Sequence, residues 1–296
     1  MKTRATIIAA LALSALCGAL AQAGQTATPA RRQSATGGQG NAQGTKTQGA
    51  AAQSPKQAGR PPLKARPSGD AAIIRTLADA MGFVRGLGRG ETTNTLNRLQ
   101  WFGTGTMVDN NQQYRVTKYS YAMTLSLNGA REDIQRQTTG GRQERIVRAY
   151  LGQDAWNEKT PGVDATPAAN QAKARRLQFL RTPFGFTKAL LQTPTPPAKV
   201  ADPGPGGRVT IDVTLEGVPI TATLDADYRP ASIAMTVDGR NIVTKYAQYR
   251  DLAEYGVMFP TRVTETVDGR PTLNLTIDDG RVASYLILQS PSGSGT

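Results

Sequence analysis

Residues 209–240 read VTIDVTLEGVPITATLDADYRPASIAMTVDGR, the most regular pattern in the chain. Apolar residues take every second position in three segments, which are separated by Glu216-Gly217 and by Asp225 to Pro230. A period of two is typical of half-buried β-strands, and short turn-forming pairs favour hairpins. This stretch therefore predicts antiparallel strands that follow one another along a sheet.

The same pattern extends toward the C-terminus and gives a meander of about six strands. Val-Asp-Gly-Arg occurs at 237–240 and again at 267–270, which indicates one type of hairpin turn used twice. Asp278-Asp279-Gly280 is interpreted as a further turn, before a last strand over Val282 to Leu288.

The first half of the chain predicts four or five more strands, between residue 99 and residue 158. Tyr119 to Leu127 alternates clearly, whereas the strand around Arg131–Thr138 is polar. Gly103-Thr104-Gly105 lacks the following helix and the Lys-Ser/Thr of a phosphate loop. Glycine in a strand indicates a bend or a close backbone approach, and a tight bend of a barrel is the favoured interpretation here.

Three segments have helical spacing instead. The first starts at Ser68 or Asp70, carries apolar residues from Ile73 to Val84, and is expected to end at Gly86, Gly88 and Gly90. The other two are central, over 168–181 and, beyond Pro183, over 184–191. The predicted fold is mainly antiparallel β (α+β): a curved, open half-barrel sheet of about 10–11 strands, covered by these helices.

The N-terminus predicts export. Lys2 and Arg4 precede an apolar stretch that ends at Ala21-Gln22-Ala23, the order of a cleavable signal peptide over residues 1–23, cut after Ala23. A membrane anchor is disfavoured, because the stretch is shorter than the roughly 20 residues of a spanning helix and rich in Ala. Export implies a periplasmic location, where nucleic acid is not an expected partner.

Residues 24–69 form a predicted disordered linker, rich in Gly, Gln and Pro. It carries seven basic residues, no acidic residue and one large aliphatic residue, Leu63, so it cannot bury enough apolar surface to fold. More than half of the chain's net charge of +13 lies outside residues 70–290, the predicted domain. The linker is expected to be a solvated spacer or to attract anionic membrane or envelope polymer. Residues 291–296 are a predicted flexible tail.

The residue types exclude much chemistry. The chain has no histidine, and its single cysteine, Cys17, lies in the signal peptide, so triads, Cys-His nucleophiles and ordinary zinc sites are excluded. Glu132/Asp133, Asp225/Asp227 and Asp278/Asp279 could act as paired carboxylates, but turn formation already explains the last two pairs. The sequence therefore predicts no catalytic residue, no metal and no cofactor.

A set of large apolar side chains spreads over the predicted strands and central helices. They form either an ordinary core or the wall of a cavity for an acyl chain. The set comprises Trp101, Tyr119, Tyr121, Met123, Trp156, Leu177, Leu180, Phe184, Phe186, Leu190, Met235, Tyr246 and Phe259.

Three stretches are similar to the periplasmic lipoprotein-carrier superfamily of LolA/LolB type: residues 95–105, residues 149–156 and the segment from Leu224 to Pro260. The resemblance covers about residues 70–290. It implies an open half-barrel with helices as a lid over an apolar cavity for lipid or lipoprotein acyl chains. The long basic linker departs from the family pattern.

Three functions remain open from the sequence. The first is a non-catalytic periplasmic protein that holds a lipid or lipoprotein acyl chain in an apolar cavity. The second is an envelope sensor or scaffold that binds a protein partner through an exposed sheet edge. The third is a hydrolase of envelope polymers that uses carboxylates, which would need two acids converging in a cleft.

Overall fold

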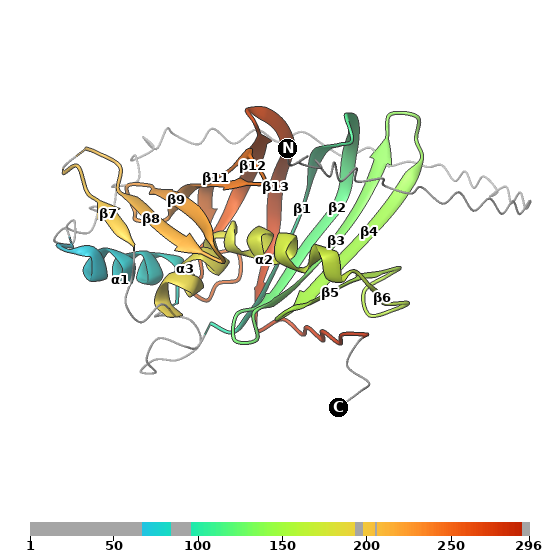
Figure 1. Ribbon diagram of the computed structural model, residues 1–296, viewed down its shortest axis with the longest axis horizontal. Helices are drawn as coiled ribbons and strands as arrows, with labels where there is room; N and C mark the ends of the chain where they lie inside the picture. Colours follow the sequence, from blue (N-terminus) through green and yellow to red (C-terminus); the bar gives the residue numbers. More distant parts are fainter. Residues whose placement is uncertain (1–66, 84–95, 193–197, 205, 292–296) are drawn as a thin grey trace, which may run out of the picture. The chain divides into compact units, whose positions relative to one another are not determined.

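The computed structural model describes residues 67–83, 96–192, 198–204 and 206–291, all within one compact unit that spans Leu63–Thr296. The predicted signal peptide, nearly all of the predicted linker, and residues 292–296 of the predicted tail lie outside the described residues. The helices lie on one face of a broad sheet (Figure 1). That face is called the inner face below, and the other is the outer face.

The sheet is a single antiparallel sheet of 13 strands, and its order is β6-β5-β4-β3-β2-β1-β13-β12-β11-β10-β9-β8-β7. The predicted open, mainly antiparallel fold is confirmed. The first and last long strands, β1 and β13, pair at the centre and join the two halves of the chain. The strands are β1 Arg98–Asp109, β2 Gln112–Thr124, β3 Gly129–Thr138, β4 Gln143–Leu151, β5 Asp154–Glu158, β6 Thr166–Pro167, β7 Lys199–Ala201, β8 Thr210–Leu215, β9 Val218–Leu224, β10 Pro230–Val237, β11 Arg240–Arg250, β12 Phe259–Val267 and β13 Arg270–Val282.

The hairpin turns follow the sequence closely. Glu216, Asp238 and Asp268 each have a positive φ and each precede a glycine with positive φ, the conformation that two-residue hairpin turns require. Both copies of Val-Asp-Gly-Arg connect paired strands in the same way, since Val237 pairs with Arg240 and Val267 with Arg270. The prediction of one turn used twice is confirmed.

Three α-helices and a short 3-10 turn cover the inner face: α1 Asp70–Met81, η1 Ala169–Gln171, α2 Ala172–Leu180 and α3 Pro183–Gln192. Helix α1 is shorter than predicted, because Gly82 adopts a left-handed conformation (φ 89°) and its N–H bonds back to the last turn. Val84 and the three glycines expected to end the helix lie outside the described residues. No described helix is long and apolar enough to span a membrane.

Two predicted boundaries at the C-terminus are wrong. Asp278-Asp279-Gly280 is not a turn but part of β13, where the register against β1 shifts by one residue. The sheet then ends at Val282, so the strand expected up to Leu288 is instead an extended segment without strand pairing. The strand count exceeds the predicted one because β6 and β7 are only two and three residues long.

Both outermost strands of the sheet are short. β6 contains Pro167, which cannot donate a backbone hydrogen bond, and β7 begins with Lys199. Short edges with proline or lysine resist pairing with another chain. A partner that adds a strand to either end of the sheet therefore finds little backbone to bind.

Candidate functional site

Twelve of the thirteen predicted cavity residues lie in one hydrophobic cluster between the inner face and the helices. Trp101 stacks on Tyr121 with ring centroids 5.2 Å apart, and Phe184 of α3 lies 5.8 Å from Trp101 and 5.4 Å from Phe259. These ring contacts join helix α3 to the inner face of the sheet. The clustered residues are Trp101, Tyr119, Tyr121, Met123, Leu177, Leu180, Phe184, Phe186, Leu190, Met235, Tyr246 and Phe259.

Trp156 is the exception, because it lies outside this cluster. Its neighbour Ala155 belongs to the inner cluster, and consecutive strand residues point to opposite faces, so Trp156 faces outward. The indole N–H of Trp156 donates a 2.7 Å hydrogen bond to Glu158 Oε1. Trp156 is therefore part of a different site from the other twelve residues.

A buried carboxylate, Glu132, lies beneath α2 on the inner face. Its Oε1 accepts hydrogen bonds from Gln178 of α2 (2.8 Å) and from the hydroxyl of Tyr119 (3.3 Å). Arg148 lies 3.7 Å from Glu132 Oε2. Burial, and next the charge of Glu132, raises the pKa of Tyr119 well above its usual value. A cavity of about 10 Å³ beside Glu132 has room for about one water molecule.

Helix α2 is fastened to the sheet by polar side chains along its length. Arg175 donates hydrogen bonds to the carbonyls of Ala149 (2.7 Å) and Trp156, and to Asn157 Oδ1 (2.6 Å). Burial lowers the pKa of Arg175 to about 10. At the other end of the helix, Arg181 forms an ion pair with Glu265 of β12. These contacts tie α2 to both halves of the sheet.

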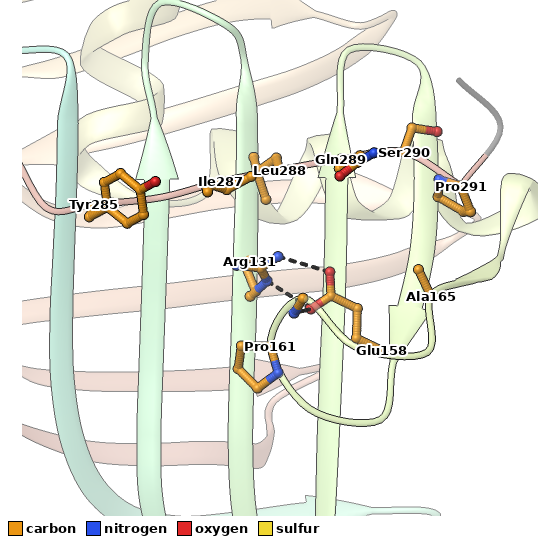
Figure 2. Close-up of a pocket in the computed structure, with 11 residues that line it drawn as sticks. Arg131, Glu158, Pro161, Ala165, Tyr285, Ile287, Leu288, Gln289, Ser290 and Pro291 are labelled. Carbon is orange, nitrogen blue, oxygen red and sulfur yellow. Dashed lines mark hydrogen bonds and ion pairs between the residues drawn. The ribbon is translucent and has the colours of Figure 1, made fainter. Parts of the chain in front are cut away.

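A groove of about 860 Å³ lies on the outer face, between the C-terminal segment and the loop after β5 (Figure 2). In Figure 2 residues 285–291 cross over the strands, opposite Pro161, Ala165 and the side chain of Glu158. This volume lies within the range of about 300–1,000 Å³ that small-molecule sites occupy. The lining residues are Arg131, Glu158, Pro161, Gly162, Ala165, Tyr285, Ile287, Leu288, Gln289, Ser290 and Pro291.

The polar part of the groove is an ion pair whose charges are already matched. Both ends of the Arg131 guanidinium contact Glu158, at 2.9 Å for each contact. Glu158 also accepts the Trp156 indole N–H and the backbone N–H of Gly162 (2.6 Å). This pair therefore offers little net charge to a ligand, and ligand selection falls to the apolar part of the groove.

Apolar side chains at the rim of the groove are exposed to water. Tyr285 is 82% exposed and Ile287 55%, and Val163, in the loop that provides Gly162 and Ala165, is 49% exposed. These three make up half of the six large apolar side chains that are exposed among the described residues. Tyr285 and Ile287 line the groove and mark a surface suited to an apolar ligand.

In each of the three acidic pairs, arginine already binds at least one carboxylate. Glu132 and Asp133 are consecutive on β3 and face opposite sides of the sheet, and Asp133 binds Arg145 through both oxygens at 2.9 and 2.7 Å. Asp225 and Asp227 both contact Arg229 in a turn. Asp279 contacts Arg281 at 3.0 Å. Within the described part of the chain, no three acidic, histidine or cysteine residues are grouped as metal ligands.

The groove residues were missed because their signal in the sequence is weak. Arg131, Glu132 and Asp133 belong to the strand expected to be polar, yet β3 is largely buried, and its charges are paired. Adjacent residues of opposite charge, as in Arg131-Glu132-Asp133, are the available sign of such pairing. The C-terminal segment could not be placed, because its alternation matches that of a paired strand.

Comparison with known proteins gives no family. No family model matches the chain, and no curated protein matches it. The crystal structure of LprF from Mycobacterium bovis aligns with 76% of this chain and 99% of its own, at 9% sequence identity and a TM-score of 0.31. So low a TM-score supports no conclusion about fold or function, and the site is therefore interpreted from its geometry.

Proposed function

We propose that this chain is a non-catalytic binding protein of the cell envelope, which holds the acyl chain of a lipid or lipoprotein in the outer groove. The observation that carries the proposal is the groove of about 860 Å³ with exposed Tyr285 and Ile287 at its rim. The periplasmic location rests on the signal peptide predicted over residues 1–23.

The driving force would be the removal of apolar surface from water. Each methylene of a chain buried in the groove contributes about 0.8 kcal/mol. The rim side chains Tyr285 and Ile287 would lose exposed surface at the same time. The matched ion pair of Arg131 and Glu158 needs no charged group on the ligand, which favours an uncharged chain in this part of the site.

The cluster beneath the helices is the second candidate location for the same ligand. The inner face carries the larger apolar surface, and the sheet that bears it is unclosed. A chain that enters there would have to separate α3 from Trp101 and Phe259, which the structure shows in contact with Phe184.

The test is uptake of a fluorescent fatty acid by the purified mature chain, with mass spectrometry of a non-polar extract. Replacing both rim residues, Tyr285→Ser with Ile287→Ser, should weaken binding at least tenfold, because roughly two methylene equivalents of burial are lost. The matched control, Leu127→Ser with Tyr255→Ser, changes two exposed apolar side chains (63% and 53% exposed) that do not line the groove. This control should bind like the unchanged chain.

The outcomes separate the two locations. Weaker binding in Leu190→Ala, within the inner cluster, together with unchanged binding in the rim variant, would place the ligand beneath the helices. A reproducibly empty extract, from protein that also takes up no fatty acid, would rule out acyl-chain binding altogether.

A further inference from the structure

The outer face of the central strands carries a group of cations that form no ion pair with any residue in the described part of the chain. Arg115 and Lys118 lie on β2, Lys245 on β11 and Arg262 on β12, and all four are exposed. Each is next in sequence to a residue of the inner cluster or inner face, such as Val116, Tyr119, Tyr246 and Val263, so each points outward. These four residues are called the outer cations below.

The strand register places the outer cations in two adjacent rows. One row runs from Arg115 through Thr106, Asn274 and Thr264 to Lys245. In the second row Thr104 pairs with Thr276, which pairs with Arg262, and Lys118 lies at the irregularity of β2 opposite Thr104. Four strand spacings of about 4.8 Å separate β2 from β11, so the rows extend about 19 Å across the sheet.

No acidic side chain interrupts these two rows, whose other outward residues on the five strands are Thr, Asn and Ala. The acids nearest along β13, Asp278 and Asp279, lie beyond the rows, where Asp279 already contacts Arg281. Among the described residues, the one side-chain hydrogen bond of an outer cation joins Arg262 to the Thr276 hydroxyl, at 3.3 Å. The charge is therefore available to an anionic partner.

We propose that the outer cations dock the protein onto an anionic lipid membrane. Short hydroxyl and amide side chains between the cations leave them free to reach a broad surface. Neither row presents an aromatic side chain on which a base could stack, which disfavours single-stranded nucleic acid. The outer groove opens on the same face, since Arg131 and Glu158 also face outward, so a docked protein would present the groove toward lipid. Docking depends on charge alone and goes beyond acyl-chain binding.

The test is flotation of the mature chain with phosphatidylglycerol vesicles and with phosphatidylcholine vesicles. The quadruple variant Arg115→Gln, Lys118→Gln, Lys245→Gln, Arg262→Gln removes the outer cations. The matched control removes four exposed cations elsewhere: Lys159→Gln, Lys173→Gln, Arg240→Gln and Arg270→Gln. Both variants keep the basic residues of 24–69 and have the same net charge.

The proposal predicts that phosphatidylglycerol binding falls at least tenfold more in the quadruple variant than in the control, because each cation near an anionic bilayer contributes about fivefold. The difference should shrink as salt rises toward 1 M, where screening reaches about 3 Å. Equal losses in the two variants would overturn the proposal, and so would unchanged vesicle binding with loss of binding to duplex DNA or a soluble polyanion. Fatty-acid uptake without vesicles should persist in the quadruple variant, which separates this test from that of the groove.

Discussion

Two glycines allow β1 and β13 to approach closely at the centre of the sheet. A Cβ added at Gly103 would lie 2.2 Å from the carbonyl oxygen of Thr276, and one added at Gly105 would lie 2.0 Å from that of Asn274. The register of β1 shifts beside both residues. The sequence favours a tight bend over a close backbone approach at 103–105, whereas the structure shows the close approach, and its cause is the neighbouring strand β13.

Gly105→Ala should therefore destabilise the protein by about 1–3 kcal/mol, because the β13 backbone must move to admit the methyl group. Urea denaturation measures this change. Gly140→Ala is the matched control, since its added Cβ would come no closer than 3.9 Å to another atom. Equal stability of the two variants would show that β1 and β13 can move apart to admit the methyl group with no loss in the free energy of unfolding.

At the scale of single residues, the sequence predicts which side chains are buried better than it predicts which face of the sheet they lie on. The sequence places Trp156 in the apolar set, and because Ala155 and Trp156 are both apolar, either residue could face the helices. The register decides between them, since Tyr150 of the inner cluster pairs with Ala155. A five-residue strand carries too few alternations to reveal its own inner face.

Among the elements, α2 is held by buried polar contacts as well as by its apolar face. Arg175→Met should destabilise the protein by about 2–3 kcal/mol, because the carbonyl of Ala149 and Asn157 Oδ1 would lose a charged donor while buried. Thermal or urea denaturation provides the measurement. Lys173→Met, at an exposed position of the same helix, should leave stability within about 0.5 kcal/mol. A similar effect from both substitutions would contradict the anchoring role.

The ends of strands were predictable where an Asp-Gly pair forms a turn with positive φ. They were uncertain where another Asp-Gly pair lies at a bulge within a strand. Asp-Gly pairs end strands at 238–239 and at 268–269, yet Asp279-Gly280 continues β13. The difference comes from β1, which still offers Trp101 and Phe102 as partners there. β13 ends only where β1 begins, at Arg98, whose carbonyl accepts the N–H of Ala283.

Four buried tyrosines and the half-buried Tyr249 make the whole molecule sensitive to alkali. Burial raises the pKa of Tyr119, Tyr121, Tyr150, Tyr246 and Tyr249 above the usual value. In the unfolded chain they ionise near pH 10, so the stabilisation is complete below that pH and is lost above it. Between pH 10 and pH 11, the contribution of each tyrosine to the free energy of unfolding should fall by about 1 kcal/mol. Together these losses are enough to unfold a protein of ordinary stability near pH 11.

Urea denaturation at a series of pH values, with tyrosinate absorbance followed in parallel, checks this expectation. The rise in tyrosinate absorbance should coincide with unfolding. Because the chain has no histidine, stability should change little between pH 6 and pH 8. A free energy of unfolding that stays constant up to pH 11 would show that these tyrosines reach water in the folded state.

The place of β13 has a consequence for the order of folding. Its partner β1 lies about 180 residues earlier in the chain, so the central pairing closes a very long loop. Until the ribosome has made the last strand, β1–β5 and β8–β12 are two half-sheets that each expose an unpaired long edge. Pairings this distant in sequence make folding slow. The pairing of β1 with β13 is therefore absent during most of synthesis. The native state can form only after translation is nearly complete.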